Sequence, residues 1–536
     1  MIASRTLTAL AVLALSLPGG QAVARQDHDT LPLGSRDLVE QRSTTSLAPG
    51  VTLTRIVRGQ ADPAAFWTVE MSVPSGPQSP DPDAAASVLK GEQSSQAFAG
   101  ELVDAGFPAR AEKVTTPAVT DFAGGTLGWR VRVGRFADQQ SATAEQARLA
   151  AAGYRGSAFY SGWDPDRSAR GPWHVDVLTI APRRFTGTLD ASFGPDLEQR
   201  ETTSALARAA GAIAGVNAGF FVFDPAAGAP GDPAGAGVYG GRLLSEAISG
   251  RPALTFRSDA RGSAVTRLRW TGAVSNSRGR SLPLDGINRV PTLIRNCGGT
   301  ADDLPTAQPL HDVTCSDPDE LVAFTPEFGP RTPAGEGVEA VLDQRGVVLD
   351  VRSPRGGALP PNGRSVQATG DLASALRAIA QPGQRLRLST ALRTSTNRTL
   401  PLTRYTSVVN GGPELVRDGS LHVTPATDGM VHPGDPSFYY GWVHKRNPRT
   451  FAGTDRRGRL VLVTADGRST GSLGLSILET ARVARSLGLV DAINLDGGGS
   501  TTMVVGGDVI NDPSDSSGER PVGDALLLLD GAVPSH

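Results

Sequence analysis

The chain has 536 residues, of which 20% are charged, and a formal net charge of −2. Its length predicts two or three domains. A nearly neutral chain has no bulk electrostatic attraction for nucleic acid, so we expect no nucleic-acid partner. No apolar run is long enough for a membrane-spanning helix, so we expect no membrane span.

The first 24 residues have the pattern of an export signal. Arg5 supplies a positive charge, residues 7–17 form a short apolar run, and Ala22-Val23-Ala24 is a small-residue cleavage site. The sequence therefore predicts a secreted protein whose mature chain begins near Arg25.

The chain contains two cysteines, Cys297 and Cys315, on either side of a loop rich in Asp, Pro and Thr. In an exported protein, such a pair is expected to form a disulfide. Neither the cysteine spacing nor the seven scattered histidines makes a zinc pattern. A polar turn at residues 511–516 lacks the EF-hand spacing for Ca²⁺, and we interpret it as solvated. No cofactor is predicted, although the need for a divalent cation stays open.

Residues 25–63 are polar with weak strand character and are expected to form a lead-in segment. A compact unit is expected over residues 64–163. Its alternating and helical stretches follow the order strand, helix, strand, strand, helix, strand, at residues 66–73, 84–105, 109–114, 128–136, 141–151 and 157–160. This βαββαβ order predicts a ferredoxin-like domain.

The stretch Trp129-Arg130-Val131-Arg132-Val133-Gly134-Arg135-Phe136, with the Ala-rich helix after it, resembles the SPOR domain family. The resemblance implies binding to peptidoglycan glycan strands. Trp129 and the arginines could stack on sugars and contact carboxylates from one face of the sheet. The alternative is that Trp129 belongs to the core and the arginines are merely solvated.

After a charged linker at residues 164–172, a larger domain is expected over residues 173–532. Strands with glycine turns dominate it, so the whole chain is expected to be α+β. Residues 225–237 are nearly all Ala, Gly, Pro and Asp, which is typical of a mobile loop beside a site. Residues 430–447 are rich in His, Tyr and Trp and are expected to face the substrate.

The most informative stretch is a glycine loop near the carboxyl end. A strand at residues 459–464, a helix with the capping box Ser476 and Glu479, and a strand at residues 491–495 predict a βαβ crossover. The loop would then lie at the carboxyl end of the second strand, where open sheets bind ligands. Its peptide N–H groups could line up on an anion, and no lysine follows as a P-loop requires. The alternative is a tight turn between two strands.

The motif Asn494-Leu495-Asp496-Gly497-Gly498-Gly499-Ser500 resembles the signature of the phosphodiester glycosidases. Further blocks are similar in the same order, at residues 215–221, 286–289, 448–450 and 519–522. The chain departs from the family at Asn447, where a His is usual, and at Asp524, where Asn is common.

This resemblance implies hydrolysis of a sugar-1-phosphodiester at its C1–O bond. The leaving group is a phosphate monoester, stable as an anion, so the reaction needs cations and N–H donors more than a strong general acid. Asp496 is the first candidate for base or nucleophile and Glu519 the second. Asn217, Asn288 and Asn494 would orient the sugar. The phosphate would be held by Arg449, Arg520, Gly497, Gly498, Gly499, Ser500 and Thr501.

Structural roles are the alternative for each candidate. Asp496 could cap the following turn, Glu519 could pair with Arg520, and the asparagines could bond their own backbone. For the whole protein, the expectation is a hydrolase associated with the cell wall, whose partners are a sugar-1-phosphodiester and peptidoglycan. The open alternatives are a metal-dependent phosphodiesterase and a non-catalytic wall-binding protein.

Overall fold

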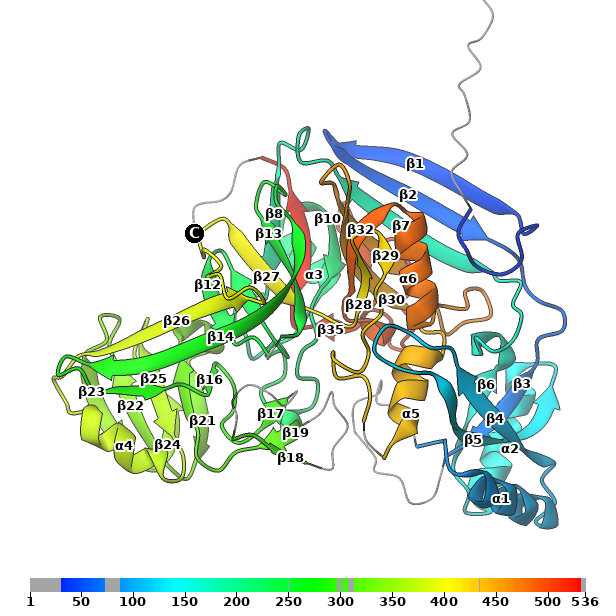
Figure 1. The fold of residues 1–536 in the computed structure, drawn as a ribbon, viewed down its shortest axis with the longest axis horizontal. Coiled ribbons are helices and arrows are strands. Elements are labelled where there is room, and N and C mark those ends of the chain that lie inside the picture. Colours follow the sequence, from blue (N-terminus) through cyan, green and yellow to red (C-terminus); the bar gives the residue numbers. More distant parts are fainter. Residues whose placement is uncertain are drawn as a thin grey trace, which may run out of the picture.

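The computed structural model describes residues 30–72, 87–248, 250–295, 300, 302–306, 313–432 and 434–531. Three bodies lie along the long axis of the molecule: a small α/β lobe, a central body of packed sheets and a second β lobe (Figure 1). Strands with a few short helices build all three, so the prediction of an α+β fold is confirmed. The predicted export signal lies outside the described residues. In the described part, no helix is long and apolar enough to cross a membrane.

The main sheet of the central body has the strand order β1-β2-β7-β31-β30-β32-β28-β29. The predicted lead-in segment supplies β1 and β2, and β2 pairs along its whole length with β7, so this segment extends the sheet. The strands are β1 (Glu40–Ala48), β2 (Val51–Arg58), β7 (Trp173–Ile180), β31 (Leu460–Ala465), β30 (Arg449–Asp455), β32 (Leu489–Asn494), β28 (Glu414–Arg417) and β29 (Ser420–Leu421).

The predicted βαβ unit is present as β31, α6 (Ile477–Ser486) and β32. β30 lies between the two strands and is antiparallel to both, so β31 and β32 run in the same direction. The capping box is also present, because Ser476 accepts from the Glu479 amide while Glu479 accepts from the Ser476 amide. The glycine loop therefore follows the carboxyl end of β32, as predicted.

A second sheet, of order β34-β33-β10-β36-β8, packs against the first. Their shared core joins Leu178 and Leu462 of the main sheet to Val216 and Leu526 of the second. The helix α3 (Thr203–Ala210) packs on the second sheet through Leu206. These strands are β34 (Asp508–Val509), β33 (Met503–Val505), β10 (Ala212–Asn217), β36 (Ala525–Leu529) and β8 (Thr188–Ser192).

A third sheet, of order β12-β11-β27-β13-β14-β15, links the central body to the second β lobe. Its long strand β14 (Ala264–Asn276) pairs with β26 (Leu386–Thr394), and this ribbon crosses to the lobe in Figure 1. The other strands are β12 (Arg242–Ser245), β11 (Gly237–Tyr239), β27 (Thr406–Asn410), β13 (Pro252–Arg257) and β15 (Ser281–Pro283). The lobe contains β16 (Gly286–Ile287), β20 (Leu321–Phe324), β25 (Arg364–Ala368), β22 (Val338–Leu342), β23 (Val348–Arg352) and α4 (Leu372–Ile379).

Cys315 lies buried on β19 (Val313–Ser316), between the central body and this lobe. Cys297 lies outside the described residues, so the disulfide stays a prediction. The remaining short strands are β17 (Ile294–Arg295), β18 (Leu304–Pro305), β21 (Arg331–Gly335) and β24 (Arg355–Ala358), together with the pair β9 (Glu201–Thr202) and β35 (Pro521–Val522).

The small lobe has the predicted βαββαβ order. Its strands β3 (Trp67–Met71), β4 (Ala109–Thr116), β5 (Gly125–Phe136) and β6 (Gly156–Tyr160) form one antiparallel sheet of order β4-β5-β3-β6. The helices are α1 (Glu92–Asp104) and α2 (Gln139–Ala151). Val131 and Val133 face them, in a core that also contains Leu102 and Leu149. Because residues alternate along a strand, Arg130 and Arg132 lie on the opposite face.

That opposite face is covered by the central body. Arg130 pairs with Asp164 at 2.5 Å, and Arg132 pairs with Glu70 at 2.9 Å, all of them buried. The Tyr440 hydroxyl, from the distant helical segment Tyr440–His444, donates to Glu70 at 2.7 Å. The prediction that these two arginines contact carboxylates of a bound glycan is therefore wrong, because their guanidinium groups pair with Asp164 of the linker and Glu70 of β3, and Tyr440 of the central body bonds to the same group.

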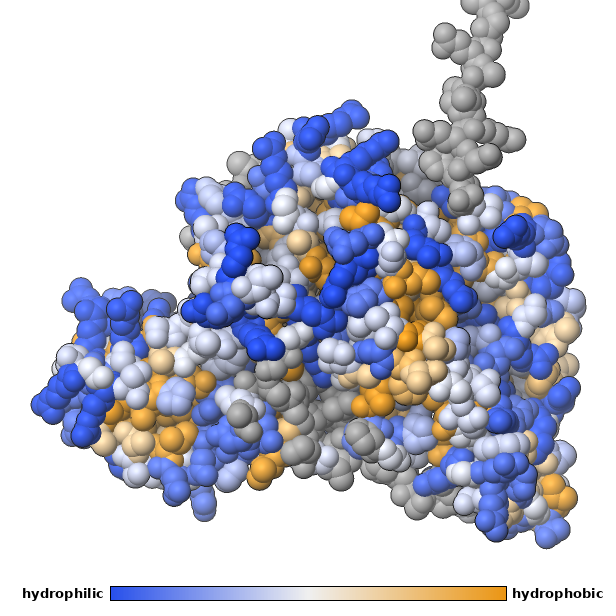
Figure 2. Space-filling view, viewed as in Figure 1, coloured by the Kyte–Doolittle hydropathy of each residue, from blue (hydrophilic) through white to orange (hydrophobic). Residues whose placement is uncertain are grey.

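The aromatic segment at residues 430–447 forms much of this contact and not the substrate-facing loop that was expected. Its helix α5 (Pro436–Tyr439) brings the Ser437 hydroxyl within 3.0 Å of the amides of Val88 and Leu89. Apolar side chains gather on the visible surface over α6 and α5 (Figure 2), where Trp442 and Leu478 are partly buried against the core.

Candidate active site

Three asparagines from distant parts of the chain end three strands next to the glycine loop. Asn217 ends β10, Asn410 ends β27 and Asn494 ends β32. The Asn217 amide donates to the Asp496 carbonyl at 2.7 Å, and the Asn494 amide donates to the Gly412 carbonyl at 3.0 Å. These side-chain hydrogen bonds connect the strand ends to one another and fix the position of the loop.

Asn410 was not predicted. Its amide donates to the Phe220 carbonyl at 3.1 Å, and its oxygen accepts from the Phe220 amide at 2.9 Å. The available signal was the run Val409-Asn410-Gly411-Gly412, in which Asn and glycines close an apolar strand much as they do after Ile493.

The backbone of the glycine loop is largely satisfied within the protein. Asp496 donates its amide to the Ala218 carbonyl at 2.9 Å, and its carboxylate accepts from the Gly497 amide at 3.0 Å. The Gly498 amide donates to the Pro448 carbonyl at 3.0 Å. The prediction that these two glycine amides cradle a phosphate is not supported, because both have an acceptor in the protein. Asp496 does cap its own turn, which was the structural alternative.

Several side-chain oxygens of the loop, in contrast to its backbone groups, are not satisfied by hydrogen bonds. The hydroxyls of Ser500, Thr501 and Thr502 and the side-chain oxygen of Asn494 are buried and have no hydrogen-bond partner among the described residues. An unsatisfied buried polar group costs about 1–3 kcal/mol, so four in one loop is unusual. They are suited to bind hydroxyl or phosphate oxygens of a polar ligand.

Gly499 is required by close packing. A Cβ atom there would lie 2.2 Å from Nη2 of Arg520 and 2.2 Å from Oδ1 of Asp515. Arg520 and Asp515 form a bidentate pair at 2.7 and 3.0 Å. Arg520 is thus at the loop, as predicted, with its charge shared with a carboxylate.

Arg449 is also beside the loop but points its donors at backbone carbonyls. It is 2% exposed, and it donates to Leu475 at 2.9 Å and to Trp442 at 2.7 Å. This arrangement favours a structural role for Arg449 over phosphate binding. Asn447, which replaces the usual His, donates to the Gly441 carbonyl at 2.9 Å and is likewise structural.

Two other candidates lie apart from the loop. Both carboxylate oxygens of Glu519 accept from Ser204 in the first turn of α3, at 2.8 Å from its amide and 2.5 Å from its hydroxyl. Asn288 donates to the Leu244 carbonyl at 2.9 Å and accepts from the Thr325 amide at 2.8 Å in the turn after β16. These bonds favour structural roles for both residues.

A second carboxylate, Asp524, lies beside the same turn as Asp496. It accepts from the Gly219 amide and from the Tyr239 hydroxyl, each at 2.7 Å. Burial raises the pKa of Asp524 to about 6, although both hydrogen bonds oppose the shift. The Asp524 carboxylate and the Asp496 backbone amide therefore bond to the neighbouring residues Gly219 and Ala218.

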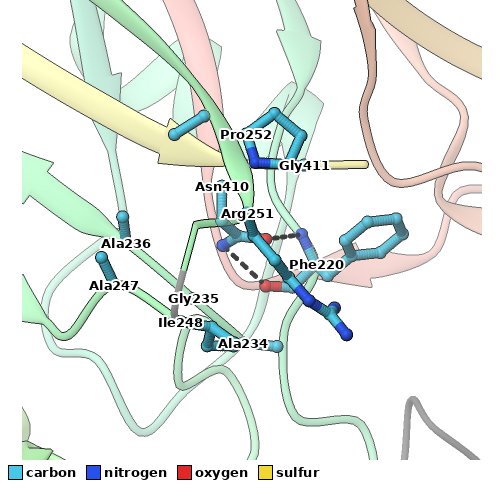
Figure 3. A pocket seen from close by; sticks show the side chains of 11 residues that line it. Phe220, Ala234, Gly235, Ala236, Ala247, Ile248, Arg251, Pro252, Asn410 and Gly411 are labelled. Carbon is cyan, nitrogen blue, oxygen red and sulfur yellow. Dashed lines mark hydrogen bonds between the residues drawn. The ribbon is translucent and has the colours of Figure 1, made fainter. Parts of the chain in front are cut away.

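A pocket of about 280 Å³, including open solvent, lies next to these strand ends. Figure 3 shows Asn410 bonded to the Phe220 backbone and Arg251 extending beside Phe220. The pocket reaches the glycine-loop strand, because a Cβ on its residue Gly411 would lie 2.6 Å from the Asn494 carbonyl oxygen. The lining residues are Phe220, Ala234, Gly235, Ala236, Ala247, Ile248, Arg251, Pro252, Ala253, Asn410 and Gly411.

Groups of side chains that could hold a metal ion lie elsewhere in the described part of the chain. One contains Asp164, Asp166 and His444 at the interdomain contact, and the other contains Asp285, Asp302 and Asp317. Asp164 already pairs with two arginines.

The fold and the glycine loop agree with the family to which the chain belongs. Residues 336–529 match the family model of the phosphodiester glycosidases, and residues 86–160 match that of the SPOR domain. The chain is a member of the phosphodiester glycosidase family with a SPOR domain ahead of its glycosidase domain.

Among individual relatives, mouse N-acetylglucosamine-1-phosphodiester alpha-N-acetylglucosaminidase is 32% identical over 163 residues, which are 30% of each chain. The human enzyme of that name is 35% identical over 113 residues, 21% of this chain and 22% of its own. The match thus spans less than a third of these curated relatives.

Solved structures cover more of the chain. A Burkholderia pseudomallei protein, named as an exported protein, is 35% identical with a TM-score of 0.81 over 93% of this chain and 98% of its own. A Synechocystis protein is 17% identical with a TM-score of 0.52 over 91% of this chain and 76% of its own, and it shares the fold alone.

Proposed function

We propose that the protein is an exported hydrolase that cleaves a sugar-1-phosphodiester at the C1–O bond. The observation that carries this proposal is the cluster of unpartnered buried oxygens of Asn494, Ser500, Thr501 and Thr502 beside Asp496. Sugar hydroxyls and phosphate oxygens are the groups that such a cluster can bind. The mammalian relatives act on an N-acetylglucosamine-1-phosphodiester, as their name states, which supports this substrate class.

In this proposal, Asp496 activates water or stabilises the oxocarbenium-like centre at C1. Its position is fixed from both sides, by the Asn217 amide on its carbonyl and by the Ala218 carbonyl on its amide. The departing phosphate monoester is already a stable anion, so electrostatic stabilisation matters most. Arg251, which lines the adjoining pocket, supplies positive charge, while the charge of Arg520 beside Gly499 is shared with Asp515.

The SPOR domain supports a location at the cell wall, with peptidoglycan glycan strands as the binding partner. The relative named as exported supports secretion, as does the signal pattern of the first 24 residues. Substrates in such a location would be wall phosphodiesters that contain a sugar-1-phosphate.

Hydrolysis in ¹⁸O-water tests the reaction. Purified mature protein is incubated with UDP-GlcNAc and with a synthetic GlcNAc-1-phosphodiester, beside Asp496→Asn and the matched control Asp491→Asn on β32, the strand that leads into the loop. We expect label in the released sugar, lost with Asp496→Asn and kept with Asp491→Asn. Label in the phosphate would show P–O cleavage instead, and no turnover of any diester would contradict the proposed activity.

A further inference from the structure

A second pocket adjoins the first and contains a buried carboxylate without a partner. It encloses about 390 Å³, including open solvent, and shares Ala234, Gly235 and Ile248 with the first pocket. Asp232 lines it and is 3% exposed, and neither of its carboxylate oxygens has a hydrogen-bond partner among the described residues. A buried carboxylate is costly unless it is paired, so this arrangement indicates a ligand group that pairs with it.

The charges around Asp232 indicate the sign of that group. Burial raises the pKa of Asp232 well above its usual value, the acids Glu246 and Glu198 raise it further, and Arg289 opposes them. Arg289, however, already pairs with Glu246 at 2.8 Å and with Glu320. Of the charged side chains that line the pocket, Asp232 and Glu246 are acidic and Arg289 is basic, so the pocket favours a cationic group over a phosphate.

The pocket is joined to the candidate active site through short backbone contacts. The Val222 amide donates to the Asp232 carbonyl at 2.8 Å, and the Ala234 amide donates to the Phe220 carbonyl at 2.7 Å. The Asn410 side chain bonds to both the amide and the carbonyl of Phe220. A ligand that occupies the first pocket can thus continue into the second along Ala234 and Gly235.

We propose that the second pocket binds an ammonium group on the aglycone of the phosphodiester substrate, with Asp232 as its counter-ion. This inference rests on the proposed hydrolase activity and specifies its substrate class as diesters of amino alcohols. A primary ammonium satisfies both carboxylate oxygens with its three donors. Val222, Val290 and Leu293 in the wall can pack against the alkyl carbons that carry it.

Three diesters of GlcNAc-1-phosphate test this proposal. Their aglycones are 2-aminoethyl, 2-hydroxyethyl and propyl, which have nearly the same size and differ in charge and hydrogen bonding. We expect kcat/KM at pH 7 to be about tenfold or more higher for the aminoethyl diester than for the other two. Asp232→Asn should abolish that preference and leave hydrolysis of the propyl diester unchanged. Asp224→Asn, the same change in the same segment but outside the pocket, should keep it.

The outcomes separate the two proposals. Equal turnover of all three diesters would overturn the ammonium site while supporting the hydrolase activity. Equal kcat/KM for the hydroxyethyl and aminoethyl diesters would also overturn the ammonium site, because it would show that Asp232 recognises a hydroxyl. If no diester reacts, the hydrolase proposal fails, and calorimetry with O-phosphoethanolamine still tests the pocket. Binding that is lost with Asp232→Asn would support the ammonium site, and no binding to the wild type would overturn it.

Discussion

The Tyr239 hydroxyl donates a 2.7 Å hydrogen bond to Asp524, whose other oxygen accepts from the Gly219 amide at 2.7 Å. Both bonds are buried, and they connect β11 and the start of β36 to the turn that holds Asp496. Asp524 stands where Asn is common in the family, and Asn could make two bonds with the same partners without carrying a charge.

Asp524→Asn is therefore expected to stabilise the protein in a pH-dependent way. The folded-state pKa, about 6, is above the usual 3.8, so the wild type loses stability as pH rises from about 4 to about 6. The variant does not titrate, and its advantage should reach about 3 kcal/mol at neutral pH. Denaturant unfolding at several pH values measures this difference. The exposed change Asp530→Asn should give no pH-dependent difference, and a constant offset for Asp524→Asn would contradict the assignment.

Asn217→Asp replaces a donor with an acceptor and leaves the shape unchanged. The Asp496 carbonyl would lose its 2.7 Å hydrogen bond and face a carboxylate. We expect a loss of about 2–3 kcal/mol in unfolding free energy. A displaced loop should lower kcat/KM about 100-fold. Thr450→Val is the control, because it removes only the 2.7 Å bond to the Asn217 oxygen. A fully active Asn217→Asp would show that this tether does not position Asp496.

Gly499→Ala should separate the glycine loop from the Arg520–Asp515 pair, because its Cβ would lie 2.2 Å from atoms of both side chains. We expect a loss of about 1–3 kcal/mol in stability and a marked loss of activity. Thermal unfolding and diester hydrolysis measure the two effects. In Gly471→Ala the nearest atom is 3.6 Å from the added Cβ, so this variant should match the wild type. Equal stability and activity of the two variants would mean that the glycine loop can move to accommodate the added methyl group.

The interdomain contact should weaken in acid through Glu70. Burial favours its protonated form, but Lys445, Arg132 and Arg130 outweigh this and hold the pKa of Glu70 at about 2. Its contribution is complete above the ordinary value of 4.5 and is lost as pH falls through 2. Glu70→Gln leaves buried cations unpaired, so we expect a loss of about 3–5 kcal/mol. Calorimetry should show one transition for the wild type and for Glu92→Gln, and two for Glu70→Gln. A single unchanged transition in Glu70→Gln would argue against this network as the link.

The elements with local signals could be predicted from the sequence. The capping box of Ser476 and Glu479 fixed the start of α6, and alternating residues located β5 and β7. Gly100 lies inside α1 without ending it, although glycine is a poor helix former, because Leu102 and Ala99 anchor that helix in the core.

The sequence could not show how donors are used after folding. Arginine commonly binds phosphate or carboxylate ligands. In the folded protein, however, Arg449, Arg130 and Arg132 donate to groups of the protein itself. Asp232 gave no signal in a stretch of small residues, because its lack of a partner depends on packing between distant segments. The roles of Asp496, Asn494, Ser500 and Thr501 in binding and catalysis stay predictions.

The ion pairs of Arg130 and Arg132 have a consequence for how the protein would act on a polymer. A SPOR domain on a flexible tether would let the glycosidase domain search a wide volume around its anchoring point. Here Tyr440 and Lys445 of the glycosidase domain bond to Glu70 in the sheet of the SPOR domain and hold the two domains together. The distance between a bound glycan strand and the glycine loop would then be constant. Cleavage would fall at one spacing from the anchored strand, and the length of the released fragments would report that spacing.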